Sequence, residues 1–499
     1  MTGALATLPE DILTRRANRM LRIEPRYATL LAILGAVLAI RLVGLALSNA
    51  ELYFDEAQYW VWSQGPAFGY YTKPPLIAWL IAAGTSVCGD QPFCVRLPSP
   101  IVHFATSLLV HAVAMRLFDR RIAFWSAIIY ATMPGASVSA TLMSTDVPLL
   151  FFWTLGLLAI TRHVERPSLA DGLLLGVAVG FGLNAKYAMI YLPLCFVLYA
   201  IADREARRAL LHPGTLAGLA VAAALIAPNV LWNAEHAFAT FAHTRDNAAG
   251  VSRFPNFIGV LEFVGIQAAI LGPVAFLAYG FALAAKAGGV DDRARLLLVY
   301  HSLPVFVLIA LQAFVARANG NWAATAFPAA AILGTAAMFA LDWRKGIRAT
   351  IDIAAVTLVG ATLSGTLVGV LTWGPLGNEL GKMRGWSDLA AEVRRVADEQ
   401  KIDTLVFTQR GLTASMIYEL RDSGLTVKAW RPDPEFPRDH FELTRPWMAT
   451  DPGPVLLIEM GDEPPPDEVV LRSVRVALVP TTVHIAKRSG WVASVYRTD

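Results

Sequence analysis

The fold is decided at one junction, where TLLAILGAVLAIRLVGLAL (residues 29–47) leads into ELYFDEAQYWVWSQGPAFGYYTKPP (residues 51–75). The first stretch is about as long as an α-helix must be to cross the hydrocarbon core of a bilayer. The second stretch is rich in aromatic residues and carries two adjacent carboxylates, Asp55 and Glu56, and a lysine, Lys73, before two prolines. The sequence therefore predicts ionisable side chains at the mouth of a membrane helix.

The composition of the whole chain is typical of a polytopic membrane protein. Of its 499 residues, 55% are hydrophobic and 16% are charged, whereas about 25% of the residues in a soluble globular protein are charged. Hydropathy predicts eleven membrane spans. They cover residues 28–48, 98–117, 122–142, 147–162, 169–185, 187–202, 215–232, 257–283, 296–315, 325–342 and 349–371. We expect residues 1–27 to form a cytoplasmic segment and the first span to be kept as an anchor, because no cleavable-signal pattern precedes it.

The basic residues of the connecting segments predict the orientation, because cytoplasmic loops are enriched in Lys and Arg. One side carries Arg15, Arg16, Arg19, Arg22, Arg26, Arg116, Arg120, Arg121, Arg162, Arg166, Arg204, Arg207, Arg208, Lys286, Arg293, Arg295, Arg344, Lys345 and Arg348. The opposite side carries Lys73, Arg96, Lys186, Arg245, Arg253 and Arg317. This bias predicts a cytoplasmic N-terminus and a first loop, residues 50–97, outside the cytosol. Topology explains the basic segments, so no nucleic-acid partner is expected.

The composition becomes that of a soluble domain after residue 371. The segment SDLAAEVRRVADEQ (387–400) has helical periodicity, whereas TLVFTQ (404–409) and PVLLIEM (454–460) are typical of short buried strands. We therefore expect a transmembrane domain over residues 28–371 and a small α/β domain over residues 372–499. An odd number of spans puts this second domain on the outer side.

The cysteines leave one structural question open. Cys88 and Cys94 lie close together in the first loop, and proteins outside the cytosol form disulfides. Gly89 and Pro92 can supply the turn that a small disulfide loop needs, but the sequence does not decide between a disulfide and two thiols. Cys195 lies in a predicted helix and is expected only to pack there.

Six polar clusters fall on the outer side of this topology. They are Asp55-Glu56, YYTKPP (70–75), STDVP (144–148), NAKY (184–187), WNAEHAFATFAHTRDN (232–247) and RANGNW (317–322). A charge at membrane depth is costly and is by default a functional hypothesis, so we expect the clusters to line one cavity. Plainer alternatives exist for some members. Asp146 fits a helix N-cap, Lys186 fits a side chain that extends to the membrane interface, and His236 and His243 fit ordinary loop histidines.

This set of residue types suits one kind of chemistry. A carboxylate outside the membrane can act as the general base on an acceptor hydroxyl. Nearby lysines and arginines can neutralise the charge that develops on a phosphate leaving group. Because nucleotide sugars are scarce outside the cytosol, the natural donor is a sugar linked to a lipid phosphate.

The ordered series of motifs resembles the GT-C glycosyltransferases. It consists of the acid pair after the first span, the aromatic loop ending in Lys-Pro-Pro, Arg-Leu-Pro before the second span and Thr-Asp-Val-Pro-Leu before the fourth. Over residues 28–330 the chain is similar to the bacterial branch that contains protein O-mannosyltransferases and the lipid A aminoarabinose and galacturonosyl transferases. The resemblance implies an enzyme of the bacterial inner membrane. It would move a sugar from a polyprenyl phosphate to a glycolipid or protein acceptor on the periplasmic face, with inversion of the configuration at C1 of the sugar.

The resemblance also assigns roles to individual residues. Asp55 matches the catalytic aspartate and is followed by Glu56, Lys73 matches a donor-phosphate ligand, and Asp146 and Lys186 match polar residues at later span junctions. Further contacts to the donor or the acceptor are expected from Gln58, Tyr70, Tyr71, His243, Arg317, Asn321 and Trp322.

Two departures separate the chain from the aminoarabinose enzymes. Those enzymes have a metal-associated glutamate before Lys-Pro-Pro, where this chain has Thr72, so no cofactor is certain and dependence on a divalent metal stays an open question. They also favour arginine where this chain has Gln58, so their donor and acceptor do not carry over.

A glycolipid flippase or transporter is the alternative from another functional class. Transporters place polar residues near the bilayer midplane, often within inverted repeats. Here the polar residues gather in outer segments, and the two halves show no convincing repeat. A family member that only binds glycolipid is a third possibility, which the retained Asp55, Lys73 and Asp146 argue against.

Overall fold

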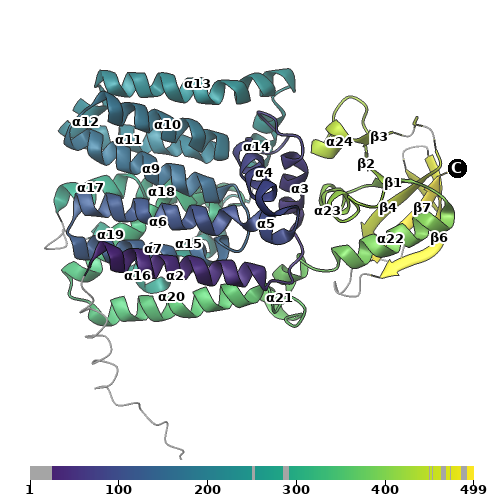
Figure 1. Ribbon diagram of the computed structural model, residues 1–499. Coiled ribbons are helices and arrows are strands. Elements are labelled where there is room, and N and C mark those ends of the chain that lie inside the picture. Colours follow the sequence, from purple (N-terminus) through teal and green to yellow (C-terminus); the bar gives the residue numbers. More distant parts are fainter. Residues whose placement is uncertain are drawn as a thin grey trace, which may run out of the picture.

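The computed structural model describes residues 25–249, 253–284, 291–448, 450–451, 453–461, 468–471, 474–484 and 492–498. A bundle of long helices forms one body, and a smaller domain of helices and strands sits at one end of it (Figure 1). Within the described residues, seven helices are long and apolar enough to cross a membrane, and eight if a bent pair counts as one. The chain is therefore a multi-pass membrane protein, as the composition predicts.

The long apolar helices follow the predicted spans closely. They are α2 (Tyr27–Ala46), α6 (Pro98–Leu117), α9 (Asp146–Glu165), α13 (Pro213–Glu235), α18 (Leu303–Val315), α19 (Phe327–Ala340) and α20 (Arg344–Ser364). Short helices extend three of these spans at their N-terminal ends, namely α5 (Pro92–Arg96), α17 (Asp292–Tyr300) and the 3-10 helix η2 (Gly320–Ala326).

The other predicted spans are broken or short, and proline and glycine explain the breaks. The span at 122–142 divides into α7 (Arg120–Thr132) and α8 (Pro134–Ser139), because proline lacks the N–H that would continue the helix. The span at 257–283 is α15 (Phe257–Leu271) and α16 (Pro273–Ala284), bent by 110° at Gly272, which has a positive φ of 92°.

Two neighbouring spans and one helix of the first loop are apolar but short. Residues 169–202 form α10 (Leu169–Ala185), the 3-10 helix η1 (Tyr187–Ile190) and α11 (Tyr191–Ala202). The helix α4 (Leu76–Cys88) lies in the first loop, where no helix was expected. Each of the eleven predicted spans is thus helical, but among the described residues only seven, or eight with the bent pair, are full-length apolar helices, because hydropathy does not measure the unbroken helix in each segment.

Glycines bring α10 and α13 into close contact. A Cβ atom on Gly172 would stand 2.0 Å from the carbonyl oxygen of Gly214, and one on Gly176 would stand 2.1 Å from that of Gly218. Small residues at such spacing let membrane helices approach backbone to backbone. α10 and α13 are therefore packed side by side.

The C-terminal domain is built on a seven-stranded sheet. Its strands are β1 (Thr404–Phe407), β2 (Thr426–Trp430), β3 (Pro446–Trp447), β4 (Val455–Gly461), β5 (Glu468–Leu471), β6 (Val474–His484) and β7 (Val492–Thr498). Their order is β3-β2-β1-β4-β7-β6-β5, parallel from β3 to β4 and antiparallel from β4 to β5. The predicted helix at 387–400 is α22 (Trp386–Gln400), and the two predicted strands are β1 and β4.

This domain and the first loop share one apolar core. The helix α3 (Phe54–Ser63) of the loop packs beside α23 (Arg410–Glu419) of the domain (Figure 1). Trp62 and Ile77 from the loop belong to the same buried cluster as Leu389 and Met416 from the domain. The carboxylate of Glu51 adds a polar contact, since it accepts hydrogen bonds from the N–H groups of Trp386 and Ser387 at 2.7 and 3.2 Å. The docking is therefore an extensive interface.

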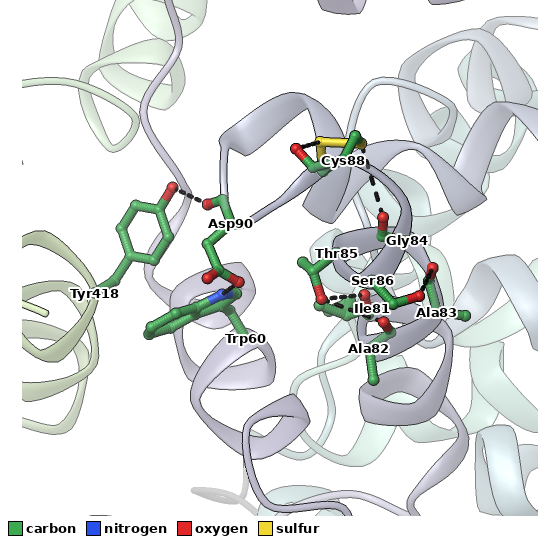
Figure 2. The surroundings of a disulfide bond; sticks show 11 residues. Trp60, Ile81, Ala82, Ala83, Gly84, Thr85, Ser86, Cys88, Asp90 and Tyr418 are labelled. Atoms are coloured by element: carbon green, nitrogen blue, oxygen red, sulfur yellow. Dashed lines mark hydrogen bonds between the residues drawn. A yellow bond between two sulfur atoms is a disulfide. The ribbon is translucent and has the colours of Figure 1, made fainter.

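Cys88 and Cys94 form a disulfide that shapes one part of this interface (Figure 2). Inside the small loop that the disulfide closes, the carboxylate of Asp90 accepts a 2.7 Å hydrogen bond from the indole N–H of Trp60. The carbonyl oxygen of Asp90 accepts another, also of 2.7 Å, from the hydroxyl of Tyr418 on α23. The disulfide loop thus connects α3 with the C-terminal domain.

Candidate active site

All six predicted polar clusters contribute to one cavity of about 710 Å³. The cavity lies at the end of the helical bundle that faces the C-terminal domain. Its charged side chains are Asp55, Glu56, Lys73, Asp146, Lys186, Arg317 and Arg410, and His243, Asn321 and Trp322 also line it. Loops, helix ends and both domains therefore converge on a single site.

Asp55 lies in the first turn of α3, where the helix dipole favours a negative charge. Its side chain is 36% exposed, and Oδ1 accepts a 3.0 Å hydrogen bond from Nη1 of Arg410. A carboxylate at the cavity wall with one oxygen engaged in this way keeps a second oxygen for a substrate hydroxyl.

Glu56 has a different environment, although it is adjacent to Asp55. Its side chain is 2% exposed and forms a buried ion pair with Arg96, with 2.7 Å between Oε2 and Nη2. The same carboxylate accepts hydrogen bonds from the backbone N–H groups of Tyr53 and Met143, at 3.0 and 2.9 Å. The first of these bonds caps α3, and the second fixes the segment before Asp146. This geometry favours a positioning role for Glu56, whereas its predicted catalytic role stays a prediction.

Lys73 is the best placed cation of the cavity for an anionic ligand. It is half-buried, and within the described ranges its ammonium group has no hydrogen-bond or ion-pair partner. Burial, and then the nearby charge of Lys186, lower the pKa of Lys73. The pKa of His243 is also lowered, by burial and by the charge of Lys73. A bound anion would favour the protonated, positively charged forms of both side chains.

Asp146 and Lys186 form an ion pair of 2.7 Å between Oδ1 and Nζ. The second carboxylate oxygen accepts a 2.7 Å hydrogen bond from the side-chain amide of Asn321. Asp146 is the first residue of α9, and no side-chain cap is present at that end. The N-cap interpretation of Asp146 and the interface interpretation of Lys186 are therefore wrong, since the two side chains bind each other inside the cavity.

Three predicted contact residues lie outside the cavity lining. Gln58 is buried, donates to the hydroxyl of Thr72 at 3.3 Å and accepts from Arg410 at 2.6 Å. Tyr70 stacks on Trp62, with 4.6 Å between ring centroids, and its hydroxyl donates to a backbone carbonyl. The hydroxyl of Tyr71 donates to the carbonyl oxygen of Pro437 in the C-terminal domain. Tyr70 and Tyr71 thus support the loop and the docked domain. Their predicted role as substrate contacts stays a prediction that this cavity lining does not support.

Arg410 lines the cavity but is not among the residues predicted from the sequence. It comes from the C-terminal domain, for which no site residue was predicted, and it reaches Asp55 across 355 positions of the chain. No local motif marks it, because its position depends on the docking of α23 against α3.

Comparisons with known proteins agree with this geometry. The family model described as dolichyl-phosphate-mannose-protein mannosyltransferase matches residues 72–232. The lipid A galacturonosyltransferase RgtD of Rhizobium johnstonii is 34% identical over 434 residues, which is 87% of this chain and 90% of the relative. The chain belongs to the GT-C glycosyltransferases.

Further matches extend across the family. The lipopolysaccharide core galacturonosyltransferase RgtA of the same organism is 30% identical over 202 residues, 40% of each chain. The crystal structure of apo ArnT from Cupriavidus metallidurans has the same GT-C fold, with a TM-score of 0.66 at 16% identity, over 94% of this chain and 98% of that one. The RgtD match is longer than the 28–330 segment that carries the motifs, so the likeness includes more of the chain than the motifs alone indicate.

The donor groups around this GT-C cavity do not fit a divalent metal. Among the described residues, no group of three or more His, Cys, Asp and Glu side chains lies close enough to hold an ion. Thr72 offers a hydroxyl that already accepts from Gln58, and the carboxylates of Asp55 and Asp146 are each engaged by a cationic side chain.

Proposed function

We propose that this glycosyltransferase moves galacturonic acid from undecaprenyl phosphate to lipid A or the lipopolysaccharide core, on the periplasmic face of the bacterial inner membrane. The acceptor class and the sugar are supported by the relatives, which are named lipid A and core galacturonosyltransferases. The longest of these matches covers nearly the whole chain, whereas the aminoarabinose transferase of Pseudomonas aeruginosa matches only 35% of it. A hexuronic acid is therefore favoured over a pentose.

The observation that carries the proposal is the convergence of Asp55 and Lys73 on one cavity at the end of the helical bundle. In the proposed reaction, Asp55 takes the proton of the acceptor hydroxyl while the hydroxyl oxygen attacks C1 of the sugar. The bond between C1 and the phosphate oxygen breaks, and its electron pair goes to the phosphate. Attack from the face opposite the phosphate inverts the configuration at C1.

Lys73 has the main role on the leaving group. Negative charge develops on the phosphate as the C1–O bond breaks, and a preorganised cation stabilises this charge in the transition state. Arg317, another cation of the cavity wall, supports the same phosphate. Asp146 neutralises Lys186 and, through Asn321, joins the ends of three helical segments, so this trio shapes the pocket.

Charge and cysteine chemistry support the proposed orientation. The side of the bundle that contains the cavity is the side predicted to be poor in Lys and Arg, and it also carries the Cys88–Cys94 disulfide. Disulfides persist in the oxidising periplasm and are rare in the cytosol. Both features support a periplasmic cavity, a periplasmic C-terminal domain and a cytoplasmic N-terminus.

The test is donor consumption by the purified protein in lipid nanodiscs. The enzyme would be offered undecaprenyl phosphate carrying galacturonic acid, aminoarabinose or a neutral hexose, each with lipid A as acceptor. We expect release of undecaprenyl phosphate from the galacturonic acid donor, and none with Asp55→Asn. Asp422→Asn is the matched control, because Asp422 is 90% exposed and outside the cavity. Consumption of the aminoarabinose donor alone would refute galacturonic acid as the transferred sugar. Lipid crossing the bilayer without consumption of any donor would refute the transferase and support a flippase.

A further inference from the structure

Arg410 is held against the first loop by three contacts to α3. Its Nη1 donates to Oδ1 of Asp55 at 3.0 Å and to Oε1 of Gln58 at 2.6 Å. Its guanidinium carbon lies 5.5 Å from the ring centroid of Phe54. The side chain is 32% exposed and lines the cavity. The C-terminal domain therefore places a cation directly on the proposed general base.

The position of Arg410 is fixed from both ends of α23. At the N-terminal end, a Cβ atom on Gly411 would stand 3.3 Å from the ring of Phe54, so α23 approaches α3 closely here. At the other end, Tyr418 bonds to Asp90 and meets the ring of Trp60 edge-on. A helix held in this way brings its arginine back to the same place whenever the domain is docked.

The ion pair with Asp55 occupies part of the proposed base as long as it persists. Oδ1 is taken by the guanidinium, so only the second oxygen is available to the acceptor hydroxyl. Guanidinium groups have five N–H donors and bind phosphate in a bidentate manner. A phosphate that enters the cavity beside Lys73 therefore offers Arg410 a second anionic partner.

We propose that Arg410 is a donor-phosphate ligand supplied by the C-terminal domain, and that it moves from Asp55 to the phosphate when the donor binds. The proposal rests on the proposed function. It links the two events that the reaction needs, because the donor that brings the phosphate also releases Asp55 to take the acceptor proton. In the absence of donor, Arg410 keeps the base engaged.

Equilibrium binding of undecaprenyl phosphate, which carries no sugar, to full-length protein in nanodiscs tests the proposal without requiring turnover. Arg410→Ala should weaken this affinity about 10- to 100-fold, the usual effect of losing a hydrogen bond between charged groups. Arg410→Lys should have an intermediate effect. Arg395→Ala is the control, because Arg395 is an arginine of the same domain, outside the cavity.

A rescue separates phosphate binding from a merely structural role. Because Oε1 of Gln58 lies 2.6 Å from the guanidinium nitrogen, an arginine introduced at position 58 can reach the same region from α3. The double variant Arg410→Ala/Gln58→Arg should therefore recover most of the lost affinity. Asp55→Asn should tighten phosphate binding in the wild-type background, where it frees Arg410, and much less in the Arg410→Ala background.

Several outcomes would overturn the proposal. Wild-type affinity in Arg410→Ala would exclude the phosphate contact. An affinity loss that Gln58→Arg does not restore, together with a lower melting temperature, would make Arg410 a structural clamp. A higher donor KM with unchanged affinity for undecaprenyl phosphate would indicate that Arg410 contacts the sugar and not the phosphate. If the wild type consumed no donor at all, the proposed function would fail, while the binding comparison would still decide the role of Arg410.

Discussion

Lys186 and Asp146 are 40 positions apart in the chain, and Nζ of Lys186 donates a 2.7 Å hydrogen bond to Oδ1 of Asp146. This pair joins the end of α10 to the start of α9, and Asn321 adds η2 to the same carboxylate. With Lys186 neutralised by Asp146, and Arg96 by Glu56, the cavity keeps Lys73 and Arg317 for an anionic ligand. The local charge balance thus favours a phosphate.

Loss of Lys186 is expected to destabilise the protein. The two side chains of the pair are only 18% and 10% exposed, and removal of one partner from a buried pair costs about 3 kcal/mol or more because the other charge is left uncompensated. Lys186→Met should lower the melting temperature, and Lys186→Met/Asp146→Asn should recover part of it. The control is Arg116→Met, whose partner Glu165 and own side chain are 38% and 48% exposed, so its loss should cost less than about 1 kcal/mol. Equal effects of the two single variants would contradict a buried pair.

Glu56→Gln is expected to act on stability more than on substrate binding. The substitution removes the charge that neutralises the buried Arg96, whose other hydrogen bonds go to the carbonyl oxygens of Ala50 and Glu51. Asp55→Asn, in contrast, should keep the wild-type melting temperature and lose about 100- to 10,000-fold in kcat, the range for a general base. Thermal unfolding and turnover of the two variants should be compared side by side. A stable Glu56→Gln enzyme without activity would restore Glu56 to the catalytic set.

Much of the candidate site could be predicted from the sequence, because it depends on topology. Polar residues next to apolar spans on one side of a membrane have few other places to lie, so the clusters of Asp55, Lys73, Asp146 and Lys186 were expected to meet. The order of these motifs along the chain was sufficient to indicate the GT-C family.

The features that could not be predicted from the sequence depend on tertiary contacts. Arg410 enters the site through the docking of a domain that follows the spans, and no local pattern encodes that contact. Tyr70 adjoins the same motif as Lys73, but its stacking on Trp62 turns it into the loop interior. Glu56 and Asp55 are neighbours, so their opposite environments follow only from the helical turn of α3. Breaks such as that at Gly272 lowered the number of full-length spans for a similar reason, since hydropathy does not report helix geometry.

Removal of the disulfide should loosen the docking of the C-terminal domain. Cys88 and Cys94 are six positions apart, and closing so small a loop contributes about 2 kcal/mol in the chain-entropy model. Cys88→Ser/Cys94→Ser should therefore lower the melting temperature and make α23 more accessible to proteolysis, because Asp90 holds Tyr418. Cys195→Ser is the control for the loss of a sulfur atom, since Cys195 is a free, buried thiol. Mass spectrometry after alkylation, with and without reductant, checks the bond itself. Full alkylation of Cys88 and Cys94 without reductant would exclude the disulfide.

The donor affinity should depend on pH through Lys73. Burial and the charge of Lys186 lower the pKa of Lys73, so its ammonium group loses its proton at a lower pH than an ordinary lysine, whose pKa is about 10.4. Only the protonated form attracts the phosphate. The KM for the donor should therefore be lowest at neutral pH and should rise as the pH passes through the lowered pKa.

The substituted enzymes distinguish this effect from general alkaline unfolding. Lys73→Arg should keep a low KM to higher pH, because a guanidinium stays charged above pH 12. Lys73→Met should show a high KM that changes little with pH over the same range. The KM profile of all three proteins, measured from pH 7 to pH 10 with thermal stability followed in parallel, checks the prediction. If Lys73→Met reproduced the wild-type rise in KM, the titrating group would be another residue, and Lys73 would not be the phosphate ligand that its unpaired ammonium group indicates.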